Sequence, residues 1–461
     1  MNNIASVSQQ LASGALSARE ALTQAVARID ATDSTVNAFT GKTLERAQQE
    51  AAAVDERRAR GEVLGPLAGI PYAVKNLFDI AGEVTLAGSK LNRSHAPAEQ
   101  DAVLVQRLRA AGAVLVGALN MDEYAYGFTT ENTHYGPCRN PHDPARIAGG
   151  SSGGSGAAIA AGQVGLTLGS DTNGSIRVPS SLCGVWGLNP TFGLLSRGGS
   201  YPFVYSIDHL GPLADCVEGL AWSYDAMQGP DPLDPGCHAL NVQPVSHRLM
   251  QGIEGLRVGV LGGYFHDNAT PPARESLAAA ASALGARDEV EWPDAALARA
   301  AAFIVTASEG GSLHLADLRA HAADFEPLSV DRFISGALQP AHWYLRAQRF
   351  RRQYRDKVNA LFGQWDILLA PATPVAAPPI GSEWIDINGT RLPCRPSMGL
   401  LTQPVSFMGC PVVAAPFWPS GTGGLPLGVQ VIAAPWREDL ALRAAHVLQA
   451  SGVAHVRESS L

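Results

Sequence analysis

Two serines and one lysine stand in stretches of this sequence whose residue types suit acyl-transfer chemistry. Ser151 lies in GGSSGGSGAAIAAG, Ser175 lies in LGSDTNGSIR, and Lys75 lies in GIPYAVKNLFD. Glycine-rich turns let backbone approach a reacting group closely. A serine hydroxyl becomes a nucleophile when a base accepts its proton, and N–H groups of a turn can stabilise an oxyanion. These stretches therefore predict a site for a nucleophile and an oxyanion.

The glycine-rich stretch also has two interpretations without catalysis. A phosphate cradle would need the Lys-Ser/Thr pair of a P-loop or a GxGxxG pattern, and the sequence has neither at this place. A purely structural glycine corner is the ordinary interpretation of GGSSGG alone. That interpretation leaves the second serine motif and the upstream lysine unexplained, so catalysis is favoured.

Lys75 directly follows an apolar segment, 70–74, that reads as a buried strand. The alternatives to catalysis are a lysine whose head reaches solvent and a structural ion pair. Burial disfavours the ammonium form and lowers the pKa of a lysine, so a neutral amine at this position could accept a proton near neutral pH.

Three motifs in order along the chain identify a family. GPLAGIPYAVKNLFDIAGEVTLAGS, GGSSGGSGAAIAAG and LGSDTNGSIRVPSSLCGVWGLNPT resemble the amidase signature family, and the resemblance extends through NMDEYAYGFTTENTHYGPCRNPHDP over most of the chain. The resemblance implies Ser175 as the nucleophile, Ser151 as the relay and Lys75 as the base. Ser152 and Ser155 remain rivals of Ser151.

The resemblance also implies the surroundings of these three residues. The backbone N–H groups of an oxyanion hole would come from residues 172–175, namely Thr172, Asn173, Gly174 and Ser175. Asp171 and Arg177 belong to the same motif, and we expect them to form structural hydrogen bonds. No metal ion or other cofactor is expected.

The substrate is indicated by finer similarities. SDTNGSIRVPSSLCGVWGL, with Asn173 where most family members have glycine, is similar to members that hydrolyse carboxylated biurets. This implies an amidohydrolase that cleaves a C–N bond of a small carboxylated urea through an acyl-enzyme and releases ammonia. Arg351 would bind the substrate carboxylate, with Arg349 as the alternative. Gly399 stands where the tRNA-linked glutaminases place an aspartate against the substrate ammonium.

Other residues and other functions stay open at this point. Tyr124, Tyr126 and Thr129 are candidates for the pocket wall, with packing as an equal alternative. The alternative functions are the glutaminase subunit of a tRNA-dependent amidotransferase and a general small-amide hydrolase of nitrogen salvage. A non-catalytic subunit is disfavoured because all three catalytic residue types are present.

The elements around the motifs predict an α/β protein. Helices alternate with apolar strands, and the resemblance to the family implies a single large mixed β-sheet covered by helices on both faces. We expect one domain, 1–461, made of N-terminal helices (1–60), a catalytic core (61–220) and the remaining sheet and pocket elements (221–461). The sequence predicts helices over 17–29, 44–60, 101–111, 269–284 and 340–365, and strands over 70–74, 113–117, 165–170 and 255–263.

Composition limits the partners. The 461 residues carry a net charge of −8, which does not favour nucleic acid, and no apolar run reaches the roughly 18 residues of a membrane span. Six scattered cysteines without a CxxC pair indicate reduced thiols and a cytoplasmic location. The resemblance implies a homodimer and a small helical subunit similar to the smallest subunit of the tRNA-dependent amidotransferases.

Overall fold

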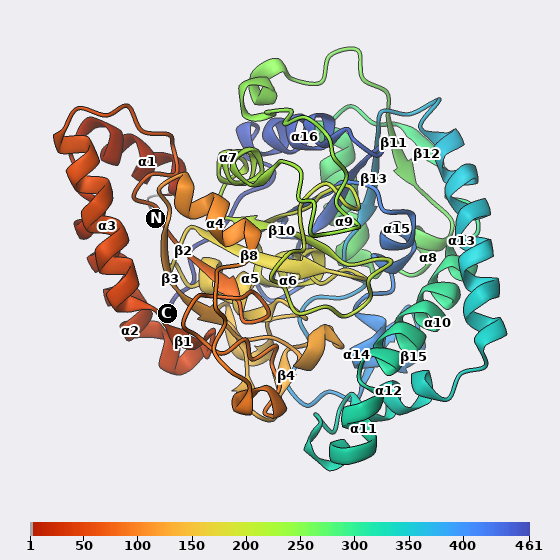
Figure 1. Cartoon of the computed structure of the whole chain (residues 1–461). Coiled ribbons are helices and arrows are strands. Elements are labelled where there is room, and N and C mark those ends of the chain that lie inside the picture. The colour runs from red at the N-terminus through yellow and green to blue at the C-terminus, as the bar shows by residue number, and fades with distance from the viewer. Residues whose placement is uncertain (1–2) are drawn as a thin grey trace.

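A mixed sheet of eleven strands forms the centre of the computed structural model, which describes residues 3–461 (Figure 1). Strands in the middle of this sheet are buried along their whole length, so helices and loops cover both of its faces. This confirms the expected α/β fold with one large mixed sheet. In spatial order the strands are β1 (Phe39–Lys42), β3 (Val114–Leu119), β2 (Pro71–Lys75), β8 (Leu166–Asp171), β10 (His209–Ala214), β9 (Trp186–Asn189), β16 (Val412–Ala415), β17 (Val429–Ala433), β13 (Ile367–Pro371), β11 (Val258–Leu261) and β12 (Asp288–Val290).

The helices lie around this sheet, with α1–α3 on one side of the molecule and α10–α13 on the opposite side (Figure 1). The capping box predicted at Ser17 and Glu20 begins α2, and the helices predicted over 44–60 and 340–365 are α3 and α13. The helices are α1 (Ile4–Ser13), α2 (Ala18–Val36), α3 (Leu44–Ala59), α4 (Val103–Ala110), α5 (Gly153–Ala160), α6 (Arg177–Cys183), α7 (Val217–Met227), α8 (Tyr264–Asp267), α9 (Pro271–Ala283), α10 (Ala295–Leu313), α11 (Leu315–His321), α12 (Val330–Ala337), α13 (Ala341–Leu361), α14 (Cys394–Ser397), α15 (Gln403–Met408) and α16 (Glu438–Ala450).

Three small two-stranded ribbons accompany the main sheet. The last of them leads directly into α14 and so places Arg395 beside the segment that follows β3. The ribbons pair β4 (Glu131–Asn132) with β5 (Gly136–Pro137), β6 (Arg139–Asn140) with β7 (Asp143–Ile147), and β14 (Trp384–Ile387) with β15 (Thr390–Pro393).

Strand register brings the chemical motifs to one edge of the sheet. β2 and β8 are parallel neighbours, with Val74 opposite Leu168. The next residue of β2 is Lys75, and the polar end of β8 carries Ser170 and Asp171. Because parallel strands end at the same edge, the lysine and the serine-bearing turn after β8 lie side by side.

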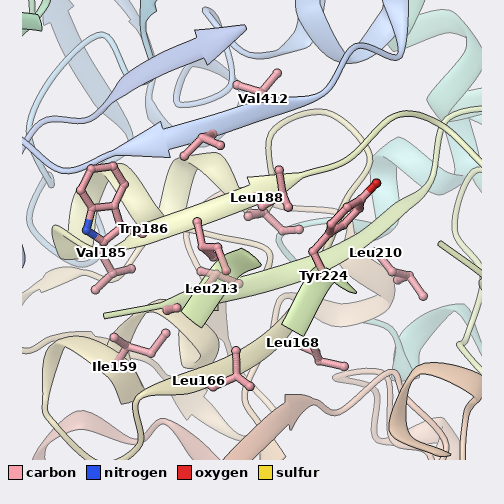
Figure 2. Packing of buried hydrophobic residues seen from close by; sticks show 14 of the residues in the cluster. Ile159, Leu166, Leu168, Val185, Trp186, Leu188, Leu210, Leu213, Tyr224 and Val412 are labelled. Carbon is pink, nitrogen blue, oxygen red and sulfur yellow. The ribbon is translucent and has the colours of Figure 1, made fainter. Parts of the chain in front are cut away.

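Apolar packing holds these strand ends in place. Side chains of β8, β9, β10 and β16 interlock with one another and with α5 and α7, and all of them are buried (Figure 2). A close-packed core of this kind resists displacement, and truncating one large side chain in such a core costs about 2–5 kcal/mol. The labelled core residues are Ile159, Leu166, Leu168, Val185, Trp186, Leu188, Leu210, Leu213, Tyr224 and Val412.

The apolar residues of α13 are only partly buried. Ala347, Tyr354 and Val358 are buried, but Trp343 at the first turn is 46% exposed. Arg351 lies on the buried face instead. The helix therefore packs through its middle and end, not through its first turn.

Two further observations concern the chain as a whole. Cys138, Cys183, Cys216, Cys237, Cys394 and Cys410 are all free thiols. Within residues 3–461, no helix is both long and apolar enough to cross a membrane.

Candidate active site

Lys75 sits at the end of β2 with its ammonium nitrogen fully enclosed by protein. Its Nζ donates to three hydroxyls: Ser151 Oγ at 2.7 Å, Ser170 Oγ at 2.8 Å and Ser152 Oγ at 3.0 Å. Burial lowers the pKa of Lys75 to about 7, although the carboxylates of Asp122, Asp171 and Asp208 act in the opposite direction. This direction agrees with the expectation from the sequence, and it would let the amine exchange a proton near neutral pH.

The three serines proposed as relay candidates differ in how their hydroxyls are used. Ser152 Oγ donates to Ser170 O at 3.1 Å and accepts the Ser170 N–H at 3.2 Å in addition to the lysine contact. Ser155 Oγ donates to Leu168 O at 3.0 Å and does not meet Lys75. Ser151 Oγ contacts Lys75 alone among residues 3–461, so its own proton remains available. The peptide bond between Gly150 and Ser151 is cis.

Ser175 lies in the turn between β8 and α6. A backbone hydrogen bond joins this turn to the residue after Ser151. The Ser152 N–H donates to the Ser175 carbonyl at 3.3 Å. The hydroxyl of Ser175 makes no hydrogen bond within the described chain, and the residue lines a small cavity. The structure therefore brings Lys75 and Ser151 into contact, and it places Ser175 on the wall of a cavity.

The predicted oxyanion hole needs one correction. The Gly174 N–H donates to Asp171 Oδ1 at 2.6 Å, so it is already engaged and is not free to bind a substrate oxygen. The N–H groups of Thr172, Asn173 and Ser175 have no acceptor among residues 3–461. A side chain at position 174 would also collide with Thr402, because an added Cβ would overlap its Oγ1, and φ there is +133°.

Asp171 and Arg177 form a buried ion pair beneath this turn, as the sequence predicts. Arg177 Nε donates to Asp171 Oδ2 at 3.0 Å, and its Nη1 donates to Gln430 Oε1 at 2.7 Å. Burial acts to raise the pKa of Asp171, but the guanidinium and its hydrogen bonds outweigh it and hold that pKa below its usual range. The carboxylate also accepts the Ile176 N–H at 3.1 Å, so it shapes the turn.

The cavity is walled by segments from both halves of the chain. Of the three predicted wall residues, Tyr126 lines it, whereas Tyr124 and Thr129 do not. The Tyr124 hydroxyl donates to Asn92 Oδ1 at 3.0 Å, and Thr129 Oγ1 accepts from Arg395 at 2.7 Å, so both are structural. The lining residues are Ala125, Tyr126, Gly127, Phe128, Thr172, Asn173, Ser175, Phe203, Phe303, Thr306, Arg332 and Gln403.

Arg351, the predicted carboxylate anchor, does not lie at this cavity. Its Nε donates to the Phe407 carbonyl at 2.9 Å and its Nη1 to the Ser206 carbonyl at 2.7 Å. These contacts tie α13 to α15 and to the loop before β10, and burial lowers the pKa of Arg351 to about 10. Arg349, the alternative anchor, is exposed on the outer face of α13.

Two residues at the site were missed by the sequence reasoning. Ser170, the third hydroxyl on Lys75, stands in the same LGSDTNGS motif as Ser175, so its position at the end of a strand was a usable signal. Arg332 lines the cavity from α12, and no local pattern marks it. Within the described chain, no three His, Cys, Asp or Glu side chains gather in a way that could hold a metal ion.

Comparison with known proteins identifies the family to which this chain is similar. Residues 20–442 match the family named Amidase. The chain is 72% identical over 447 residues to AtzE, a component of the 1-carboxybiuret hydrolase of Pseudomonas sp. (strain ADP), covering 97% of this chain and 98% of that protein. It is 36% identical over 474 residues to a component of the glutamyl-tRNA(Gln) amidotransferase of Moorella thermoacetica, covering 97% and 96%.

A solved structure shares the fold closely. It is described as an unexpected vestigial protein complex that reveals the evolutionary origins of an s-triazine catabolic enzyme. It superposes with a TM-score of 0.98 at 71% identity, covering 99% of this chain and 100% of that one.

Proposed function

This chain belongs to the Amidase family, and from that premise we propose that it hydrolyses 1-carboxybiuret, a small carboxylated urea derivative, with release of ammonia. The observation that carries the proposal is the enclosed contact of 2.7 Å between Lys75 and Ser151, together with the position of Ser175 on the wall of the cavity. The 72% identity to a component of a 1-carboxybiuret hydrolase supports this substrate over the alternatives.

The proposed reaction begins with proton transfer through the relay. Ser175 Oγ attacks the amide carbonyl as its proton passes to Ser151, while the proton of Ser151 passes to neutral Lys75. The C–N bond then breaks as the proton returns along the same path to the leaving nitrogen, and ammonia departs. Water attacks the resulting ester in the same way, which frees the acid and restores Ser175.

The negative charge on the carbonyl oxygen needs donors during both steps. We propose that the free N–H groups of Thr172, Asn173 and Ser175 supply them. Donors fixed by the backbone need no reorganisation, and removing one such donor in comparable sites costs roughly 3 kcal/mol.

Glutamine hydrolysis is the alternative, and the cavity disfavours it. No carboxylate belongs to the residues of the described chain that line it, so a substrate ammonium would lack a partner. An aspartate cannot simply be restored at position 399, because an added Cβ there would overlap the Phe128 ring. A general small-amide hydrolase remains the second alternative, because the serine and lysine machinery alone does not select a substrate.

We also propose how the protein is assembled. The proposal comprises a single domain over 1–461, a homodimer, a cytoplasmic location and a small helical partner subunit, without nucleic acid or membrane. Support for a partner comes from the similar structure, which is described as a protein complex. Co-purification from the native host followed by a mass measurement in solution tests the assembly.

The experiment that tests the function is a comparison of substrates. Ammonia release should be measured with 1-carboxybiuret, glutamine and an uncharged aliphatic amide under the same conditions. Preferred hydrolysis of 1-carboxybiuret is expected. Efficient hydrolysis of glutamine in its place would refute the assignment.

A further inference from the structure

Arg332 carries the one formal charge on the wall of the cavity that Ser175 lines, taking the residues of the chain from 3 onward. It comes from α12, a short helix that packs against α10. The wall otherwise consists of aromatic, small and uncharged polar residues. Any ligand in this cavity therefore meets a single positive centre and no negative one.

The guanidinium of Arg332 is tethered but not neutralised. Its Nη2 donates to the carbonyls of Tyr126 at 2.9 Å and Leu328 at 3.2 Å, and its carbon lies 4.4 Å from the centre of the Tyr126 ring. Its Nε and Nη1 have no acceptor among residues 3–461, and no carboxylate in that range forms an ion pair with it. The tether fixes the plane of the group and leaves its other donors free.

The nearby carboxylate of Asp122 acts on the charge of Arg332 but forms its hydrogen bonds with other groups. Asp122 accepts from Arg395 Nη2 at 3.1 Å and from the backbone N–H of Thr130 at 3.0 Å. Burial lowers the pKa of Arg332 below its usual value, and the positive charge of Arg395 acts in the same direction. Arg332 is only partly exposed, and a partly buried cation without a counter-ion is less stable than a paired one, so an anionic ligand would balance its charge.

The wall also contains an unpaired hydrogen-bond acceptor, the side-chain oxygen of Asn173. Asn173 Nδ2 donates to Thr306 Oγ1 at 2.9 Å, which turns the amide and leaves its Oδ1 buried without a donor. A ligand with a carboxylate at one end and N–H groups along its length would satisfy both features. A carboxylated urea has this pattern. Glutamine also offers a carboxylate, but the ammonium beside it would have no acidic partner among the lining residues of the described chain.

We infer that Arg332 binds the carboxylate of the substrate through its free guanidinium donors and so selects carboxylated ureas over neutral amides. The inference rests on the proposed function and assigns its specificity to a residue of α12 rather than α13. The planar fork of an arginine matches two carboxylate oxygens, which a lysine cannot do.

The test compares Arg332→Gln, Arg332→Lys and wild type, with Arg349→Gln as the matched control on an exposed arginine. The KM and kcat for 1-carboxybiuret are measured for each. The reaction of Ser175 with a neutral fluorophosphonate is measured in parallel, because this reaction reports on the nucleophile and does not require a carboxylate site.

Arg332→Gln should raise KM for 1-carboxybiuret about 30-fold or more, since a hydrogen-bonded charged group is lost. Its phosphonylation rate should stay within about twofold of wild type. Arg332→Lys should recover part of the KM, and Arg349→Gln should change neither quantity.

Two results would overturn the inference while leaving the proposed function intact. One is an unchanged KM in Arg332→Gln. The other is an equal loss of phosphonylation and hydrolysis in a folded variant, which would make Arg332 structural. Failure of the wild type itself to hydrolyse 1-carboxybiuret would instead refute the proposed function, and the inference with it.

Discussion

Arg177 and Asp171 face each other in a fork, with Nε to Oδ2 and Nη2 to Oδ1 distances of 3.0 Å each, and neither side chain is reached by solvent. The same carboxylate holds the N–H groups of Gly174 and Ile176, on either side of Ser175. One buried ion pair therefore fixes the turn that presents the proposed nucleophile.

Arg177→Met should destabilise the protein strongly, because it leaves the Asp171 carboxylate buried and uncompensated. We expect a loss of about 3–5 kcal/mol in the free energy of unfolding. Urea denaturation measures it. Arg257→Met is the control, since Arg257 pairs with Asp366 on the surface and is half exposed, and its loss should be at most about 1 kcal/mol. Equal losses in the two variants would contradict the role given to the buried pair.

Lys75 and Ser175 should behave as one catalytic unit. Ser175→Ala and Lys75→Ala should each lower kcat at least about a thousandfold, and the double variant should lose little more than either single variant. Steady-state kinetics on 1-carboxybiuret measures this. Losses that multiply in the double variant, or near-normal turnover by Ser175→Ala, would show that the two residues do not share one proton path.

Activity should rise with pH through about 7, because burial lowers the pKa of Lys75 to about that value and only the neutral amine accepts a proton. A profile of kcat/KM against pH tests this. Lys90→Met is the control, since Lys90 is a surface residue paired with Asp324, and it should leave the profile unchanged. A flat profile from pH 5 to 9 would exclude a titrating base.

The same pKa makes a prediction about stability. The pKa of Lys75 in the folded protein lies below its value in the unfolded chain, so between these two values the unfolded chain binds more protons. Stability should therefore rise with pH above about 7 through this residue. Lys75→Met should remove that part of the pH dependence, as measured by urea denaturation at several pH values.

Ser170→Ala should shift the acidic limb of the activity profile to lower pH. The Ser170 hydroxyl accepts from Lys75 Nζ at 2.8 Å, and removing an acceptor disfavours the ammonium form and lowers its pKa further. Ser155→Ala is the matched control, because that hydroxyl meets Leu168 O and not the lysine. An equal shift of the acidic limb in both variants would contradict a specific effect of the Ser170 hydroxyl on Lys75.

Gly399→Ala should destabilise the protein by about 1–3 kcal/mol, because the added carbon would overlap Phe128. Thermal or urea unfolding measures it, and the second change Phe128→Ala should recover part of the loss. Gly65→Ala is the control, since nothing lies within 4 Å of a Cβ built there. An unchanged free energy of unfolding in Gly399→Ala would mean that the Phe128 ring moves aside easily. Steric overlap would then not be the reason that an aspartate is excluded from position 399.

Elements with local signals were predicted well from the sequence. The capping box at Ser17 and Glu20 begins α2, and the apolar run before Lys75 forms a buried strand of the sheet. These features depend on neighbours along the chain, which the sequence displays. The strand β1 was missed, because its four residues owe their pairing to the edge of β3 rather than to their own pattern.

Site residues defined by distant contacts were predicted less well. Helical spacing puts Arg351 on the same face as Ala347, but it does not reveal that the carbonyls of Phe407 and Ser206 receive its side chain. Arg332 has no distinguishing motif, and only the packing of α12 brings it to the cavity. The hydrogen bond of the Gly174 N–H was also missed, although its acceptor, the carboxylate of Asp171, is only three residues away in the sequence.

The two halves of the chain contribute differently to the cavity described above. Lys75, Ser151 and Ser175 all come from its first half, whereas Phe303, Thr306, Arg332 and Gln403 enter the wall from α10, α12 and α15 in the second. Mutations in the second half could therefore change this part of the wall while the reacting groups stay untouched. Substrate preference can therefore shift through these four positions, and a variant that takes all four from a relative should move towards the preference of that relative without losing the proton relay.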